Sequence, residues 1–476
     1  MRKLRGTRSS PKKSQYSVAL SFFSVSSVVK KASLTGLSTA RRLAFFTTEL
    51  LISVMRLLTA ILALAATACV HAPRVSTTPA SPVDRATPTA PADRVVLLVS
   101  LDGFWADYIN RPAAVRLRQL AASGVRAERM VPAFPSKTFP NHYTIVTGLY
   151  PEHHGIIANS FYDAAIGRKF TVSDTAVTHD PRWWGGEPLW ITVERQGKKS
   201  ASFFWVGSDI RIGGRLPSWY RTYDGRVPNR TRVQTVLEWL SQPAGTGPAF
   251  VSTYFSDVDD AGHAFGPNAP QTDSAIARVD SLVGALADGI TTLGLKGSVD
   301  LVVVSDHGMA ALAVDRVIYL DDYVDLSRMT VVDLSPVGSL MPAAGYAAEA
   351  YRRLKGAHPR LQVYRKGELP ARLHYNANAR ITPLVTIADE GWTLTTRAAA
   401  ARLGPPRGGA HGFDNLLPSM GALFVATGPD FRTGAVVPPF QNIHVYSLLA
   451  RLLGVTPAPN DGSPDSTRTL LRAPVR

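Results

Sequence analysis

The sequence is short of cysteine and of acidic residues, and each shortage limits what the protein can be. The 476 residues include one cysteine, Cys69, so no disulfide can form within the chain. Lysine and arginine number 52 against 36 aspartate and glutamate residues, and a formal net charge of +16 can indicate nucleic-acid binding. However, residues 1–54 hold ten basic residues and one acidic residue, which leaves +7 for the rest of the chain. We therefore expect a mildly basic protein that does not bind nucleic acid.

The first strongly apolar segment is too short to cross a membrane as a helix. It runs from Met55 to Cys69, with a basic start, an apolar stretch of secretory length and small residues before the cysteine. It resembles a bacterial lipoprotein signal in which Cys69 becomes the lipidated first residue, although Ala66 stands where such signals prefer leucine. A cleaved signal ending near Ala68 or Ala72 is the alternative. We expect an exported, periplasmic protein, with a membrane anchor at Cys69 if the cysteine is lipidated.

Composition separates the rest of the chain into a linker and one large domain. Residues 1–54 are interpreted as an upstream extension or leader, and residues 55–69 as the signal peptide. Residues 70–93 are rich in proline, alanine and threonine, cannot bury a core and predict a linker. The folded domain is expected over residues 94–470, with an insertion at about 314–402. We expect this protein to be a monomer.

Strand and helix patterns alternate through residues 94–470. Apolar, β-branched runs at 94–101, 249–256 and 299–304 are typical of strands buried on both faces of a parallel sheet. Apolar periodicity predicts helices at 113–123, 141–147, 230–241, 273–292 and 443–453. This alternation predicts an α/β fold with a mostly parallel central sheet sandwiched by helices. The insertion interrupts the alternation with extended segments and predicts a smaller β-rich cap.

Carboxylates and histidines follow the predicted strands, where the functional groups of parallel sheets gather. The six residues concerned are Asp102, Asp259, His263, Asp306, His307 and His411. Asp259 and His263 are four residues apart and can share one face of a helix. Each residue alone has an ordinary alternative, as a turn cap or a hydrogen-bonded loop residue. Together they supply two sets of three ligands, which suits two divalent ions of zinc type.

A hydroxyl lies where a helix is about to begin. Thr138 stands two residues before Pro140, a residue that suits the first turn of a helix. The free N–H groups and the dipole of such a turn favour an anion, for example a phosphate. The alternative is that Thr138 only caps the helix. Beside a two-metal site, the same hydroxyl is a candidate nucleophile.

Five segments carry a resemblance to a known family. The chain resembles the nucleotide pyrophosphatase/phosphodiesterases of the alkaline phosphatase superfamily, and we expect a bacterial member. The similarity runs from about Arg94 to Val455 and rests on segments 100–103, 135–159, 259–263, 305–309 and 409–412. It implies an alkaline-phosphatase-like fold and two zinc ions. One zinc would be held by Asp259, His263 and His411, and the other by Asp102, Asp306, His307 and the Thr138 hydroxyl.

The resemblance also implies a mechanism and a substrate class. Thr138 would attack phosphorus to form a phosphothreonine intermediate, which water would hydrolyse from the opposite side. Asn159 and the backbone N–H of Phe139 would donate to the phosphate. Phe139 and Tyr223, with Trp205 nearby, would stack on a nucleotide base, whereas core packing is the alternative for Tyr223 and Trp205.

We therefore expect hydrolysis of phosphodiester and pyrophosphate bonds of nucleotides, with release of a nucleoside 5'-monophosphate. A phosphomonoesterase, in which Arg168 or Arg221 holds the extra charge, is one alternative, and a phospholipid-type phosphodiesterase with the same metal ligands is another. A surface lipoprotein that binds a ligand but has lost catalysis is a third, although all six ligands and Thr138 are present.

Overall fold

An eight-stranded sheet lies at the centre of the structure, a computed structural model that describes residues 94–243 and 245–472. From one edge to the other its strands are β19 (Ala435–Val437), β2 (Val125–Ala127), β18 (Phe424–Thr427), β9 (Val299–Val304), β1 (Val95–Leu101), β8 (Phe250–Phe255), β6 (Ser200–Phe203) and β7 (Trp219–Arg221). Only β18 is antiparallel to its neighbours in this sheet. The expected mostly parallel α/β sheet is therefore confirmed.

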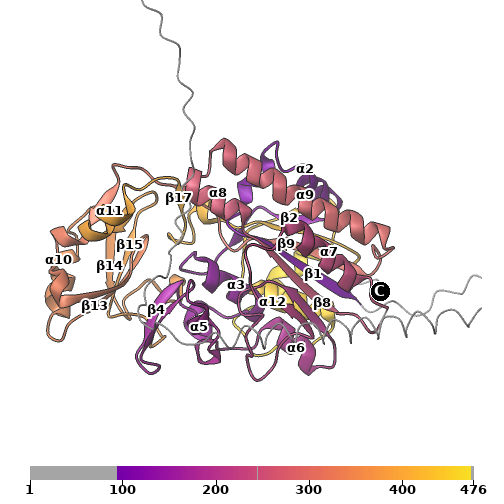
Figure 1. The fold of residues 1–476 in the computed structure, drawn as a ribbon, viewed down its shortest axis with the longest axis horizontal. Coiled ribbons are helices and arrows are strands. Elements are labelled where there is room, and N and C mark those ends of the chain that lie inside the picture. The colour runs from indigo at the N-terminus through magenta and orange to yellow at the C-terminus, as the bar shows by residue number, and fades with distance from the viewer. Residues whose placement is uncertain (1–93, 244, 473–476) are drawn as a thin grey trace, which may run out of the picture. The chain divides into compact units, whose positions relative to one another are not determined.

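Helices cover both faces of this sheet (Figure 1). One face packs against α2 (Val115–Ser123), α7 (Asn229–Leu240), α8 (Asp257–Phe265) and α9 (Pro270–Thr292). The opposite face packs against α3 (Thr138–Thr147), α6 (Leu189–Arg195) and α12 (His444–Leu453). The short helices α4 (Pro151–His154) and α5 (Thr175–Thr178) belong to the connection between α3 and α6.

Strand β1 shows why the sheet needs a helical layer on each side. Val96 and Leu98 point into the apolar cluster that contains α3 and α12, whereas Leu97 and Val99 point into the cluster that contains α7 and α9. All four side chains are fully buried. A continuous apolar run on a strand is stable only when both faces are covered, because successive side chains alternate between the faces.

Two helices begin three residues earlier than the sequence predicts, and both start near a proline. Helix α3 begins at Thr138, with Pro140 inside its first turn, and α9 begins at Pro270. The first-turn N–H groups of a helix have no partner within it, so a proline costs no hydrogen bond there. The earlier start of α3 places Thr138 in the helix itself.

The β-rich insertion is present as a separate small sheet (Figure 1). Its antiparallel strands, in spatial order, are β12 (Met329–Asp333), β13 (Val337–Pro342), β15 (Leu384–Ala388) and β14 (Leu361–Arg365). Helix α10 (Ala347–Leu354) packs on this sheet through an apolar cluster of its own. Strand β11 (Val317–Tyr319) pairs with β16 (Thr393–Thr395), and α11 (Arg397–Leu403) follows. The exact boundaries at 314 and 402 stay a prediction.

Three further two-stranded ladders lie outside these sheets. They join β3 (Met130–Val131) to β20 (Phe440–Gln441), β4 (Ser160–Asp163) to β5 (Arg168–Thr171), and β10 (Ala310–Ala311) to β17 (Gly409–Ala410). Within the described ranges, no helix is both long and apolar enough to span a membrane. The expected leader, signal peptide with Cys69 and linker fall in residues 1–93, outside the described residues.

Candidate active site

The carboxyl ends of three neighbouring strands bring the candidate ligands together. Strand β1 lies between β9 and β8 and is parallel to both. Asp102 follows β1, and Asp306 and His307 come shortly after β9. Helix α8 begins after β8 and carries Asp259 and His263 one turn apart. A hydrogen bond joins the residues that follow β1 and β9: the backbone N–H of Gly103 donates to Asp306 Oδ1 at 3.1 Å.

His411 joins this group through a short ladder between distant segments. Strand β17 pairs with β10, which begins three residues after His307, and so carries His411 to the strand ends. His411 Nε2 lies 3.7 Å from Asp259 Oδ1 and 3.1 Å from His263 Nε2. His263 Nε2 is 3.5 Å from Asp259 Oδ2. Asp259, His263 and His411 can therefore hold one metal ion between them, as the first predicted set does.

The second set surrounds His307. Its Nε2 atom lies 2.8 Å from Asp306 Oδ2 and 3.6 Å from Asp102 Oδ1. The His307 ring also stacks on the His411 ring, with centroids 3.5 Å apart and planes inclined by 12°. The two sets are thus adjacent, and Asp259 can also join Asp102 and His307 around one ion.

The three candidate histidine ligands are oriented in the same way. Nδ1 of His263 donates to the Gly409 carbonyl at 2.9 Å, and Nδ1 of His411 donates to the Ser136 carbonyl at 2.8 Å. Nδ1 of His307 lies 2.9 Å from the Gly308 carbonyl. A backbone carbonyl can only accept, so the proton of each neutral ring sits on Nδ1 and the lone pair sits on Nε2. All three lone pairs are then available to a metal ion.

Burial and neighbouring charges shift the pKa values of the buried carboxylates. Burial, with the nearby carboxylates of Asp306 and Asp259, raises the pKa of Asp102 well above its usual value. Burial opposes the ionisation of Asp306 too, but the charges of His307 and His142 outweigh it and hold that pKa well below its usual value. Asp102, Asp259 and Asp306 lie so close together that their negative charges favour the binding of a cation between them.

The histidines differ in their readiness to carry a proton. Burial and the neighbouring His307 and His263 lower the pKa of His411 well below its usual value, so the ring is neutral at neutral pH. For His307, burial acts in the same direction but Asp306 outweighs it and raises the pKa. A bound cation would compete with that proton for Nε2, since a metal ligand must be deprotonated.

The donor set fits two divalent ions. Asp102 Oδ1 and Asp259 Oδ1 are buried and have no hydrogen-bond partner among the described residues. Such orphaned oxygens are costly unless a cation or water satisfies them. Mixed carboxylate and imidazole ligands are typical of zinc sites with an open catalytic position.

Thr138 reaches the same place from the opposite face of the sheet. Lys137, not Thr138, is the cap residue of α3, and no side chain caps this helix. Thr138 is the first helical residue, and its Oγ1 lies 3.2 Å from His307 Nε2. The hydroxyl is therefore turned toward the candidate ligands, and the alternative that Thr138 only caps the helix does not hold.

Two residues beside the ligands were not singled out by the sequence analysis. His142 Nδ1 lies 3.4 Å from Asp306 Oδ2, but it also donates to the Thr138 carbonyl at 3.0 Å, and its Nε2 pairs with Ser100 Oγ at 2.8 Å. Both ring nitrogens are thus engaged, so His142 orients Asp306 and the start of α3 rather than offering a lone pair. Tyr254 donates to Asp102 Oδ2 at 2.5 Å. The signal for His142 was its position one turn after Thr138.

One of the two hydrogen-bond donors expected for the phosphate, the backbone N–H of Phe139, is already engaged. The backbone N–H of Phe139 donates to Asn159 Oδ1 at 3.0 Å and is therefore not free to bind phosphate. The same bond fixes the orientation of the Asn159 amide, because only the oxygen can accept it. Asn159 Nδ2 is left as the donor.

The three aromatic residues proposed for base stacking differ in exposure. Tyr223 is 53% exposed and packs edge-on against Phe204, with ring centroids 5.0 Å apart. Phe139 is partly buried. Trp205 is 4% exposed, and its Nε1 donates to the His142 carbonyl at 3.0 Å. The core-packing alternative therefore holds for Trp205, which supports His142, whereas Tyr223 and Phe139 keep surface that a base could cover.

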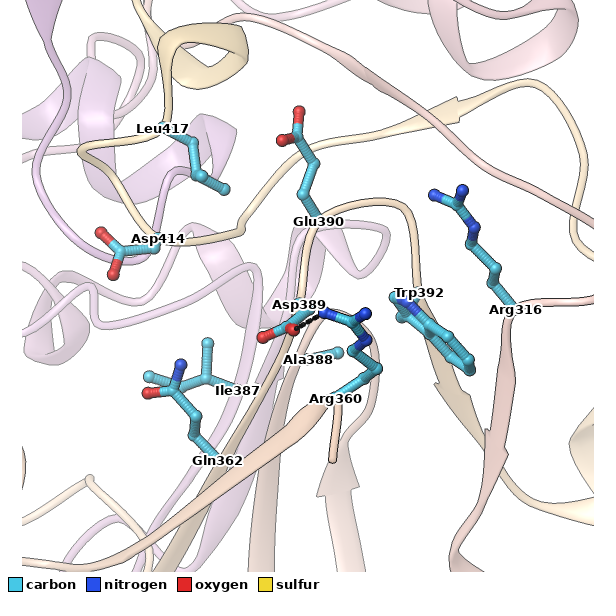
Figure 2. A pocket seen from close by; sticks show the side chains of 10 residues that line it. All are labelled: Arg316, Arg360, Gln362, Ile387, Ala388, Asp389, Glu390, Trp392, Asp414 and Leu417. Carbon is cyan, nitrogen blue, oxygen red and sulfur yellow. Dashed lines mark hydrogen bonds and ion pairs between the residues drawn. The ribbon is translucent and has the colours of Figure 1, made fainter. Parts of the chain in front are cut away.

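Two clefts lie near the junction with the insertion. Figure 2 shows the first, of about 620 Å³, whose lining residues bear charges of both signs and include the ion pair between Arg360 and Asp389. None of the candidate ligands lines this cleft. The second, of about 710 Å³, is lined in part by His263 and so adjoins the candidate active site.

Comparisons with known proteins agree with this geometry. The model of the type I phosphodiesterase/nucleotide pyrophosphatase family matches residues 96–414. The human ectonucleotide pyrophosphatase/phosphodiesterase family member 1 is 39% identical over 392 residues, which are 80% of this chain and 42% of that protein. The human bis(5'-adenosyl)-triphosphatase is 38% identical over 381 residues, 79% of this chain and 82% of that protein.

A solved structure shares the fold as well as the sequence. Murine ectonucleotide pyrophosphatase/phosphodiesterase 5, as an inactive threonine-to-alanine variant in complex with AMP, superposes with a TM-score of 0.76 and 36% identity. The match covers 80% of this chain and all of the murine one. These relatives are eukaryotic, so a bacterial origin stays a prediction. This chain spans less than half the length of the family member 1 proteins. It belongs to the type I phosphodiesterase/nucleotide pyrophosphatase family.

Proposed function

We propose that this protein is a metal-dependent phosphodiesterase that hydrolyses phosphodiester and pyrophosphate bonds of nucleotides and releases a nucleoside 5'-monophosphate. The observation that carries the proposal is the position of Thr138 Oγ1, 3.2 Å from His307 Nε2, beside two sets of carboxylate and imidazole ligands. A partly buried hydroxyl held against candidate metal ligands is the arrangement that a phosphoryl-transfer nucleophile needs.

Six residues would hold the cations: Asp259, His263 and His411 for one, and Asp102, Asp306 and His307, with the Thr138 hydroxyl, for the other. When bound, two zinc ions would supply positive charge for the phosphoryl oxygens and lower the pKa of the coordinated hydroxyl.

Thr138 acts as the nucleophile in this proposal. Its Oγ1 forms a bond to phosphorus, the bond from phosphorus to the leaving oxygen breaks, and the hydroxyl proton passes to solvent. Water then attacks the phosphothreonine, which restores the hydroxyl and releases the nucleoside monophosphate. The first residue of α3 suits this role because the helix dipole favours the negative charge that gathers at the phosphoryl group.

Asn159 and two aromatic rings that keep accessible surface bind the rest of the nucleotide. Asn159 Nδ2 donates to a non-bridging phosphate oxygen, since Asn159 Oδ1 is engaged with Phe139. Phe139 and Tyr223 offer flat surfaces for a base, and stacking on aromatic rings tolerates any base. The murine relative bound to AMP and the relative named as a bis(5'-adenosyl)-triphosphatase support a nucleotide substrate.

A panel of three nitrophenyl esters tests the reaction class. The panel compares kcat/KM for bis(p-nitrophenyl) phosphate, p-nitrophenyl phosphate and the p-nitrophenyl ester of thymidine 5'-monophosphate on zinc-loaded protein. We expect the thymidine ester to be the best substrate. A clear preference for p-nitrophenyl phosphate would instead indicate a phosphomonoesterase. Arg221, one residue considered for that activity, donates to the Tyr220 carbonyl and lies over the Trp239 ring.

We also propose that the protein is exported to the periplasm and anchored through Cys69. The proposal rests on the sequence of residues 55–69 alone. Mass spectrometry of the mature N-terminus tests it: a diacylated or triacylated cysteine is expected, and an unmodified N-terminus near residue 70 would contradict the anchor.

A further inference from the structure

In-line displacement determines the side of the site on which the leaving group departs. The attacking and leaving oxygens lie on opposite sides of phosphorus, so the leaving group departs away from Thr138 Oγ1. Thr138 contacts His307, the His411 ring stacks on His307, and His263 lies next to His411. The side chains of His307 and His411 are buried, whereas that of His263 is 45% exposed. The site is therefore open at His263.

The cleft of about 710 Å³ begins at this opening. Its walls come from residues 312–319, before and within β11, and from residues 393–410, which include α11 and β17. This volume lies within the range of sites that enclose small organic ligands. A group that departs on the His263 side of the site would therefore enter this cleft.

The chemistry of the walls indicates what the cleft would accept. Val314 and Leu403 are 66% and 72% exposed and both line it, so a ligand there would remove apolar surface from water. The cations in the lining are Arg397 and Arg407, and no described aspartate or glutamate contributes to it. Arg397 already pairs with Asp322 at 2.5 Å, which leaves Arg407 for a ligand.

The backbone holds Arg407 close to the metal ligands. The next residue, Gly408, has φ of +71°, and a Cβ there would lie 1.9 Å from the His263 carbonyl oxygen. The carbonyl of Gly409 accepts the hydrogen bond from His263 Nδ1 at 2.9 Å. Only glycine permits such a close approach, so the loop that carries Arg407 is pressed against the last turn of α8.

We propose that this cleft is the leaving-group subsite and that it selects leaving groups that combine a phosphate with an apolar or flat body, as a nucleoside phosphate does. Arg407 binds the phosphate, and Val314 and Leu403 cover the body. The inference rests on the proposed function and adds to it a preference for nucleotides joined through a phosphoanhydride over simple aryl esters. The cleft of Figure 2 has no comparable role, because none of the candidate ligands lines it and its Asp389 is paired with Arg360.

Two substrates that both transfer a nucleoside monophosphate but release different leaving groups test the subsite. Diadenosine triphosphate releases a nucleoside diphosphate, whereas the p-nitrophenyl ester of thymidine 5'-monophosphate releases nitrophenol. We expect Arg407→Gln to lower kcat/KM for diadenosine triphosphate about tenfold more than for the aryl ester, which is the loss of one charge-assisted contact. Leu403→Asp, which adds a negative charge to the wall, should shift the ratio in the same direction. Arg402→Gln is the matched control, because Arg402 is an exposed residue of α11 that does not line the cleft.

The outcomes separate this inference from the proposed function. If Arg407→Gln and Leu403→Asp change kcat/KM for both substrates by the same factor, or change neither, the leaving-group subsite is wrong while the phosphodiesterase stands. If wild-type protein loaded with zinc cleaves neither substrate, the proposed function fails and the inference fails with it. A shift of the ratio with Arg402→Gln equal to that with Arg407→Gln would also overturn the inference, since it would reflect overall charge.

Discussion

The side-chain oxygen of Asn159 accepts a hydrogen bond from the backbone N–H of Phe139 at 3.0 Å. The two residues are 20 positions apart, and the bond joins the start of α3 to the segment before β4. It orients the amide of Asn159 so that Nδ2 remains as a donor at the position expected for the phosphate.

This orientation makes Asn159→Asp an informative substitution. The aspartate keeps an oxygen for Phe139 but replaces the donor with a charged oxygen that repels phosphate. We expect kcat to fall roughly 100-fold or more, as when a transition-state donor is lost, while the melting temperature stays unchanged. Steady-state kinetics with the thymidine ester and a thermal melt measure both. Wild-type kcat in this variant would remove Asn159 from the mechanism.

Thr138→Ala should abolish turnover without emptying the metal site. The variant removes the proposed nucleophilic oxygen but retains the six other candidate ligands, so we expect about two zinc equivalents per chain by elemental analysis. Thr138→Ser, which keeps the hydroxyl, is the matched control and should retain measurable activity. Residual turnover of the alanine variant at the wild-type rate would refute the assignment of Thr138.

Removal of the metal ions by a chelator should abolish activity and lower the melting temperature. Asp102, Asp259 and Asp306 crowd one buried region, and without cations their charges repel each other. A ligand that binds only the folded state raises its stability, so the metal-free protein should melt at a lower temperature than the zinc-loaded protein. Thermal melts before and after dialysis against a chelator, with zinc then restored, measure the difference. Identical melting temperatures of the metal-free and zinc-loaded protein would show that metal binding does not stabilise the fold.

Acid should destabilise the protein through His154, a residue outside the candidate active site. Burial lowers the pKa of His154 to about 3, and the neutral ring accepts from the Ile156 N–H and pairs with Thr144 Oγ1. The unfolded chain takes up this proton near pH 6.5, so the stability that the group contributes is present above that pH and is lost as the pH falls toward 3. By pH 4.5 the loss should be about 2–3 kcal/mol.

Urea denaturation of wild-type protein and of His154→Gln at several pH values isolates this contribution. The difference between their free energies of unfolding should decrease below pH 6.5, because glutamine takes up no proton in this range. A difference that is constant from pH 7 to pH 4.5 would show that His154 does not resist protonation.

Tyr223→Ala should weaken nucleotide binding. Loss of one stacking surface should raise KM for the thymidine ester at least about fivefold, with a smaller effect on bis(p-nitrophenyl) phosphate, which carries no base. Tyr223→Phe retains the ring and should behave as wild type. Equal effects of the alanine variant on both substrates would place Tyr223 outside the base-binding surface.

The fold and most of the ligand set could be predicted from local patterns. The run before Asp102 is apolar throughout because both of its faces are covered, and that requirement is visible in the sequence. Parallel neighbours then place the carboxylates after β1 and β9 at one edge, whatever the details of packing. The spacing of Asp259 and His263 likewise survives in α8, because four residues make about one helical turn.

Local patterns along the chain therefore predict the class of the fold and the side chains that could bind metal. The hydrogen-bond partners of these groups depend on tertiary packing: the Phe139 N–H donates to Asn159, Trp205 donates to the His142 carbonyl, and Tyr254 donates to Asp102. These contacts join residues far apart in the chain. Periodicity records which face of an element is buried, but hydrogen-bond partners depend on which atoms meet when the elements pack.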